Sequence, residues 1–227
     1  MSIFSPCSMR SALVFRTRPS ARFLPAGVLA ALLLGLSCLG AKQSRIVPPE
    51  AQPPVRVEGN RVAVQVKGVE IALELLDSPA RLRFLRQRQV VDVADPFAPD
   101  PRGRYRFTTF RLDLINRSAH EVNLHPSSLQ AYADVIPQFP MEYTAYYQHF
   151  VSRLRLDPAV LERLERAAVM NNIVVPPGGR MSALLAFQDL PQQFKRFRVS
   201  CSSILVGAES HTFTVPFDVV QEKVKKR

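Results

Sequence analysis

The sequence predicts an all-β sandwich that carries a helical hairpin between two of its strands. Three observations support this prediction. Apolar and polar residues alternate over several short segments, which is typical of strands with one buried face. Turn residues recur between these segments at intervals that suit a sandwich. Residues 142–170 break the alternation and instead repeat apolar side chains at the spacing of a helix.

The predicted sandwich spans residues 60–220. Its first two strands alternate strictly, RVAVQV from residue 61 and VEIALEL from residue 69. A weaker strand is predicted at ARLRFLRQ, residues 80–87, and a long one at YRFTTFRLDLIN, residues 105–116. Shorter strands are predicted on both sides of the helical segment, at HEVNLHP, SLQAY, NIVV, RMSALLAF, FKRFRVSC and HTFTVPF.

The first predicted helix has an aromatic face. Tyr143, Tyr147, Phe150 and Leu154 fall at positions i, i+4, i+7 and i+11, which share one side of an α-helix. The pattern predicts that this face packs against the sandwich. It is also the candidate docking face for a partner protein, because connecting segments carry function more often than the scaffold does.

A second helix is predicted to begin at Asp157. Asp157 has the side chain of an N-cap, and Pro158 suits the first helical position. Leu161, Leu164 and Ala168 then form an apolar stripe. Together the two helices predict a hairpin inserted over residues 142–170.

The N-terminus has the pattern of a targeting segment. Residues 1–22 contain arginines and no acidic residue, and the run FLPAGVLAALLLGLS that follows carries no charge. A basic region before such an apolar run is typical of a signal peptide. We therefore expect the leader arginines to stay in the cytoplasm and the rest of the chain to be exported.

Cys38 ends the apolar run, and three interpretations of it remain open. Residues 34–38, LGLSC, resemble a bacterial lipobox, which implies that residues 1–37 are removed and that Cys38 carries a lipid. One alternative is an uncleaved anchor over residues 23–41, whose length approaches that of a membrane span. The other is simple cleavage near Gly40 or Ala41. All three place the chain that follows outside the cytoplasm.

The segments that flank the predicted domain are polar or rich in proline. Residues 38–59 hold two Pro-Pro pairs, which favour an extended tether between membrane and domain. Residues 221–227 cluster lysine and arginine and predict a solvated basic tail. In a cell with two membranes, Leu39 after the lipidated cysteine implies the outer membrane, facing the periplasm, because inner-membrane retention is associated with aspartate there.

Two segments are similar to bacterial secreted immunoglobulin-like domains of uncharacterised function. The first, FRLDLINRSAHEVNLHPSSLQAY, has a strand, an Asn-x-Ser turn and another strand; the second, VPPGGRMSALLAFQDLP, has a Pro-Gly turn and a strand that ends in Phe. The resemblance implies an immunoglobulin-like sandwich, export and frequent lipid anchoring, and it implies no catalytic residue. It is carried by Leu112, Leu114, Asn116, Ser118, Val122, Leu129, Pro177, Gly178, Phe187 and Pro191.

The sequence gives little support for catalysis. It has no nucleophile elbow, HExxH pair, P-loop or dinucleotide-binding motif, so we predict no catalytic residue, metal or cofactor. Cys201 lies in a predicted strand, which indicates a buried core thiol. The formal net charge of +11 includes the leader arginines. An exported basic chain is expected to meet anionic lipids or acidic polymers rather than nucleic acid.

Three hypotheses for function follow. The first is a non-enzymatic, membrane-tethered binding or structural module of the bacterial cell envelope. The second is an accessory subunit of an envelope secretion or transport complex that docks through residues 142–170. The third is an enzyme with an unrecognised site. An exposed apolar patch on residues 142–170 would favour the second hypothesis, and a pocket that gathers His and carboxylate side chains would favour the third.

Overall fold

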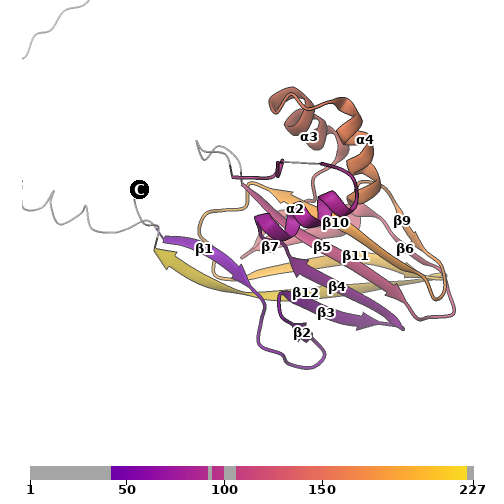
Figure 1. Cartoon of the computed structure of the whole chain (residues 1–227). Helices are drawn as coiled ribbons and strands as arrows, with labels where there is room; N and C mark the ends of the chain where they lie inside the picture. The colour runs from indigo at the N-terminus through magenta and orange to yellow at the C-terminus, as the bar shows by residue number, and fades with distance from the viewer. Residues whose placement is uncertain (1–41, 92–93, 100–105, 224–227) are drawn as a thin grey trace, which may run out of the picture. The chain divides into compact units, whose positions relative to one another are not determined.

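The computed structural model describes residues 42–91, 94–99 and 106–223 (Figure 1). The chain divides into two units, and the described residues all belong to the second, Ala41–Arg227. The predicted signal peptide, Cys38 and residues 224–227 of the predicted tail lie outside the described residues. In the second unit the chain forms two antiparallel β-sheets with a buried apolar core, as predicted for an all-β sandwich.

The five-stranded sheet has the order β10-β5-β4-β3-β2. Strict alternation explains its inner face, because Val62, Ile71, Leu73 and Leu112 are fully buried while their polar neighbours point away. The strands are β2 (Arg56–Glu58), β3 (Arg61–Val66), β4 (Val69–Leu75), β5 (Phe107–Asn116) and β10 (Arg180–Gln188). Of these, only β2 is not among the strands predicted from the sequence.

The seven-stranded sheet has the order β1-β12-β11-β6-β9, and a β7–β8 hairpin also pairs with β11. β11 bonds β7 along its first half and β6 near its end, and an irregularity between Cys201 and Ile204 separates the two pairings. The strands are β1 (Lys42–Val47), β6 (Val122–Leu124), β7 (Leu129–Ala133), β8 (Ile136–Gln138), β9 (Ile173–Val175), β11 (Phe197–Val206) and β12 (Glu209–Lys223).

Aromatic rings from both sheets meet in the main core. Phe110 of β5 lies 5.2 Å from the Phe217 ring and 6.0 Å from the Phe197 ring, measured between ring centroids. Cys201 is buried in the same core, as the sequence predicted, and burial raises the pKa of its thiol to about 11. The thiol is therefore a packing group at neutral pH rather than a nucleophile.

A second core lies between helices and the outer face of β10. Ala183, Leu185 and Phe187 of β10 face the other sheet, whereas Leu184 and Ala186 pack with the helices. β10 is therefore apolar on both faces, which explains its continuous apolar run. The helical segments are α2 (Ser78–Gln87), α3 (Tyr143–Tyr147), the π-helical turn η3 (Gln148–Arg153) and α4 (Pro158–Ala167), and a short 3₁₀ turn, η2 (Pro126–Ser128), precedes β7.

The predicted strand over residues 80–87 is wrong, because this segment is helix α2. The Asp77 carboxylate accepts a hydrogen bond from the Ala80 N–H at 2.8 Å, and Pro79 stands in the first turn. The same Asp-and-Pro signature begins α4, which was predicted correctly: the Asp157 carboxylate accepts from the Ala159 N–H at 2.9 Å. The same helix-start signature therefore precedes both α2 and α4 in the sequence.

The predicted tether over residues 38–59 and the tail over residues 221–227 need correction. Residues Lys42–Val47 form β1, which pairs along its whole length with the end of β12, Asp218 to Lys223. β1 lacks clear alternation, and it is stabilised by a partner that is distant in sequence rather than by its own pattern. Only residues 39–41 then separate Cys38 from the folded domain.

The Asn-x-Ser turn predicted after β5 is present and is held by a buried amide. The Asn116 side chain donates to the carbonyl oxygens of His120 at 2.8 Å and Val175 at 2.9 Å, and its oxygen accepts from the Ser118 N–H at 3.0 Å. Asn116 thus joins β5 to the segments that lead into β6 and out of β9.

Candidate functional site

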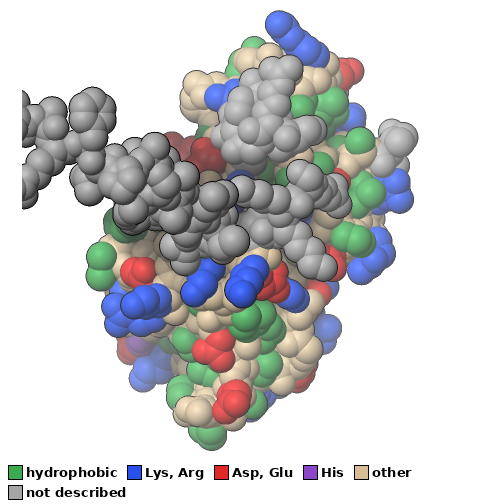
Figure 2. All heavy atoms as spheres, turned by 90° about the vertical axis from the view of Figure 1, so that its left-hand side faces the viewer, with side chains coloured by type: hydrophobic (Ala, Val, Ile, Leu, Met, Phe, Trp, Pro, Cys, Tyr) green, Lys and Arg blue, Asp and Glu red, His purple; other side chains and the backbone are tan. Residues whose placement is uncertain are grey.

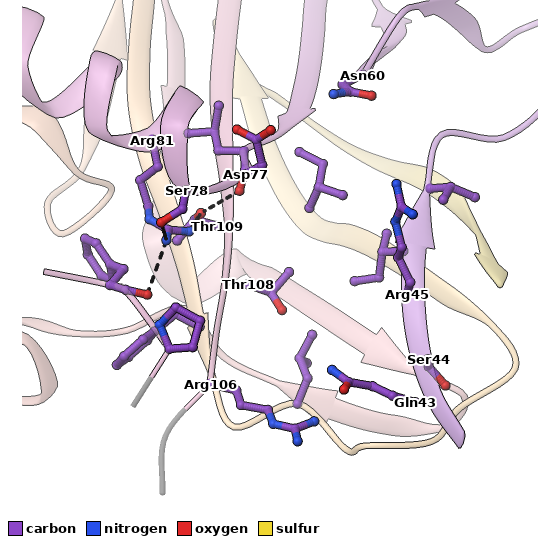
Figure 3. A pocket seen from close by; sticks show the side chains of 18 of the residues that line it. Gln43, Ser44, Arg45, Asn60, Asp77, Ser78, Arg81, Arg106, Thr108 and Thr109 are labelled. Carbon is purple, nitrogen blue, oxygen red and sulfur yellow. Dashed lines mark hydrogen bonds between the residues drawn. The ribbon is translucent and has the colours of Figure 1, made fainter. Parts of the chain in front are cut away.

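A cleft of about 670 Å³ opens between β1, the β4–α2 turn, the start of β5 and the loop after β10 (Figure 3). This volume lies within the range of small-molecule sites. The lining comes from segments that are far apart in the sequence, so only the fold brings it together. The apolar part of the lining includes Ile46, Leu75, Phe107 and Leu190.

The charged side chains that line the cleft are Arg45, Arg81, Arg106 and Asp77. Figure 3 shows Gln43 and Arg106 at one end of the cleft and Asn60 at the other. Arg106 is the more available cation, because no carboxylate lies within ion-pair distance of its guanidinium among the described residues. Arg45 also lines the cleft but is paired with Glu222 of β12 at 2.9 Å, in an exposed pair that water screens strongly.

Arg81 of α2, which lines one wall of the cleft, forms a buried ion pair with Asp95. Both side chains are less than a tenth exposed. The Arg81 Nε donates to an Asp95 oxygen at 3.0 Å, and its Nη1 donates to the Thr109 hydroxyl at 2.9 Å. The Ser78 hydroxyl and the Phe97 N–H also donate to Asp95. The pair is therefore saturated with hydrogen bonds.

The Asp95 carboxylate stays ionised in this setting. Burial by itself would raise its pKa, but hydrogen bonds from Arg81 and Ser78 and the positive charge of Arg81 outweigh burial and lower the pKa. Because these groups already satisfy one another, we assign the pair a structural role. It fixes α2 to the segment 94–99 and so shapes the wall of the cleft.

A second charged cluster covers the outer face of the five-stranded sheet. Arg61 of β3 bonds Glu70 of β4 at 2.7 Å, and Arg111 bonds Asp113 within β5 at 2.8 Å. The hydrogen bond from Arg61 favours the ionised form of Glu70 more than burial opposes it. The pKa of Glu70 is therefore lowered. The two pairs, one across β3 and β4 and one within β5, balance in charge, so we assign them a structural role on the sheet rather than a role in binding.

His149 lies outside the cleft, in the core between the helices and β10. Its Nε2 lies 2.9 Å from the Pro96 carbonyl oxygen, and its ring stands 4.5 Å from the Phe107 ring, centroid to centroid. Burial lowers the pKa of His149, more than the Pro96 hydrogen bond raises it. The neutral ring, with the proton on Nε2, fits this environment.

We expect the buried His149 to make stability depend on pH. Its folded pKa lies below the unfolded value of about 6.5, so the unfolded state binds a proton first as the pH falls. The free energy of unfolding should therefore decline as the pH drops below 6.5 and stay level above it. Urea denaturation at several pH values measures this. The His149→Gln variant, which keeps a donor toward Pro96, should respond less; an equal response would assign the effect to another group.

The predicted docking face is only partly on the surface. Tyr143, Tyr147 and Leu154 are exposed, but Phe150 is fully buried, so Phe150 is wrong as a docking residue. The buried side chains of this segment are Tyr146, His149 and Phe150, at i, i+3 and i+4, so the inward face is rotated away from the predicted one. The chain also changes from α3 to the π-helical turn η3, in which the Leu154 N–H bonds the His149 carbonyl, so Leu154 does not follow Phe150 on one α-helical face.

No three His, Cys, Asp or Glu side chains among residues 42–91, 94–99 and 106–223 lie close enough to hold a metal ion. Within the same ranges no helix has the length and apolar character that a membrane span requires.

Comparisons with known proteins add little. No protein family and no protein of curated function matches the chain. Among solved structures it is similar to the yjhA protein from Bacillus subtilis, with 6% identity and a TM-score of 0.34 over 61% of this chain and 76% of that one. A functionally unknown protein from Listeria monocytogenes EGD-e gives 10% identity and a TM-score of 0.34 over 79% of this chain and 88% of that one.

Proposed function

We propose that the chain is a non-enzymatic, membrane-attached binding module of the bacterial cell envelope. The observation that carries the proposal is the cleft, because its lining combines apolar side chains with amide and hydroxyl groups, the carboxylate of Asp77 and the guanidinium of Arg106, which is unpaired among the described residues. Such a lining suits recognition of a molecule that has an anionic group and an apolar part. Asp95 and His149 have shifted pKa values, but both side chains already form hydrogen bonds inside the protein. Their pKa shifts therefore have a structural explanation, which supports binding over catalysis.

We further propose an immunoglobulin-like arrangement of the two sheets, with residues 142–170 as a helical insertion and an N-terminal lipoprotein signal that ends before Cys38. The sandwich of antiparallel sheets and the helices between β8 and β9 support the first part. The apolar run before Cys38 supports the second.

An accessory subunit that docks through residues 142–170 is a second candidate function. The exposed side chains of Tyr143, Tyr147 and Leu154 favour it, since large apolar groups on a surface often mark contacts with other proteins. Under this alternative the cleft would be incidental, and a stable protein partner would be required.

Titration with 8-anilino-1-naphthalenesulfonate tests the binding cleft, because this dye has one anionic group on an apolar ring system. We expect saturable binding by the full chain and a loss of about tenfold in affinity for Arg106→Glu, which places a negative charge beside the ligand. Arg166→Glu is the matched control, since Arg166 is exposed on α4 away from the cleft.

The two variants carry the same change in net charge, so a nonspecific electrostatic effect on dye affinity should be the same in both. Equal affinities of Arg106→Glu and Arg166→Glu would place the dye elsewhere and remove the support for the cleft as a binding site. Thermal unfolding of each variant, followed by circular dichroism, checks that both are folded.

A further inference from the structure

We propose that the β7–β8 hairpin tip touches the surface of an anionic lipid bilayer and so sets how the domain sits on the membrane. The tip is the turn that joins β7 to β8, together with the residues that follow it. Val135 is 76% exposed, Ile136 49% and Phe139 56%, and Pro137 between them is also exposed. Exposed apolar side chains so close together suit the boundary between lipid head groups and acyl chains.

Basic side chains lie beside the tip. The Asp134 carboxylate at the turn accepts hydrogen bonds from the backbone N–H groups of Lys195 and Arg196, both at 3.0 Å, and the Asp134 N–H donates to the Arg196 carbonyl. Both side chains are exposed. The hairpin is thereby fixed to a basic loop, and the acidic residue of the turn is already occupied. Apolar and cationic groups together match an anionic bilayer surface.

The same loop holds the beginning of β1. The Gln193 side chain donates to the Lys42 carbonyl oxygen at 3.1 Å, and the Ser44 hydroxyl bonds the backbone of Phe194 at 2.8 Å. Lys42 in turn pairs with Lys223 at the end of β12. Residues 193–196 therefore connect the start of the described domain to the hairpin tip, so both lie at one end of the molecule.

The tip lies at the same end of the domain as Lys42, the first described residue after the proposed attachment point in the sequence. Only residues 39–41 separate Cys38 from Lys42, and an extended chain spans at most about 3.5 Å per residue. A lipid on Cys38 would therefore hold the domain against the head groups rather than at a distance. Figure 2 views the side of the molecule from which β1 begins, where lysine and arginine side chains lie among exposed apolar ones.

Charge repulsion at this end also favours an anionic partner. Lys42 and Lys223 stand directly opposite each other across β1 and β12, and both are exposed. Like charges in facing positions destabilise a pair of strands unless negative charge is near. Anionic lipid head groups would supply that charge. The inference rests on the proposed membrane attachment, which it deepens by assigning the surface that faces the bilayer.

Tryptophan fluorescence tests the contact, because the chain has no tryptophan of its own. Full-length Val135→Trp is purified from bacterial membranes and reconstituted into vesicles that contain phosphatidylglycerol and brominated phosphatidylcholine. Full-length Val174→Trp is the matched control, since Val174 is 49% exposed on β9, which joins the sheet through β6 at Ile204–Val206, the end of β11 away from the hairpin tip. We expect a blue shift and strong quenching by the brominated lipid in Val135→Trp, and neither effect in Val174→Trp.

Charge reversal gives a second readout. Adding Lys195→Glu and Arg196→Glu to Val135→Trp should reduce the quenching several-fold while the chain stays in the vesicle pellet. If vesicle-bound Val135→Trp is quenched no more than Val174→Trp, the tip does not contact the bilayer, although the membrane attachment stands. The exposed tip would then be assigned to contact with a protein partner. A chain that stays out of the pellet would overturn the proposed attachment and the tip contact together.

Discussion

Asp95→Asn is expected to lower the free energy of unfolding by about 3–5 kcal/mol, because it leaves the Arg81 guanidinium charged and buried without its counter-ion. The side chain barely changes in size, so the effect is electrostatic. Urea denaturation monitored by circular dichroism measures it. Glu222→Gln is the matched control, since it removes the exposed pair with Arg45 and should cost less than about 1 kcal/mol.

A double variant separates the lost pair from the charge left behind. Arg81→Met combined with Asp95→Asn removes both charges, and we expect it to recover part of the stability lost in Asp95→Asn. Similar small losses for Asp95→Asn and Glu222→Gln would mean that water reaches the Arg81–Asp95 pair, and the wall of the cleft would not be rigid.

Phe150→Ala should have a comparable effect, a loss of about 3–5 kcal/mol, because it opens a cavity in the core between the helices and β10. The Phe150 ring is fully buried and lies 5.2 Å from the Phe97 ring, centroid to centroid. Thermal or urea unfolding of the variant measures the loss.

Tyr147→Ala is the matched control for Phe150→Ala. Tyr147 is 44% exposed, and its truncation should change the free energy of unfolding by less than about 0.5 kcal/mol. A straight α-helix would place Tyr147 and Phe150 on one face, as the sequence pattern predicted. Equal losses in the two variants would therefore mean that Tyr147 and Phe150 share one buried face and would contradict the inward face formed by Tyr146 and Phe150.

The main core of the fold was readable from the sequence. Alternation predicted β3 and β4, where Val62, Ile71 and Leu73 are buried as expected. Asp157 and Pro158 predicted the start of α4. These features depend on residues close together in the chain, where local periodicity and capping carry the information.

Features that depend on distant contacts were missed. β1 is a strand because the end of β12 pairs with it, and its own residues, KQSRIV, do not alternate clearly. The Arg81–Asp95 pair depends on how the segment 94–99 folds back on α2. The cleft brings together residues as far apart as Gln43 and Gln192, so no local pattern could have indicated it.

The strand predicted over residues 80–87, where the structure has helix α2, was wrong for a different reason. Asp77 and Pro79 were as visible as the signature that began α4, but the arginines between apolar residues in ARLRFLRQ resembled strand alternation. Capping residues were the better guide here, because a short alternating run is also compatible with one face of a helix.

Membrane attachment is the central claim of the proposed function, and fractionation of cells that express the full chain or Cys38→Ser tests it most directly. With the unaltered chain we expect the protein in the membrane fraction, shortened by removal of residues 1–37 and carrying a lipid detectable by mass spectrometry. Cys38→Ser should lose the lipid and either leave the membrane fraction or remain unprocessed. A Cys38→Ser protein that is processed normally and stays in the membrane fraction would contradict attachment through Cys38.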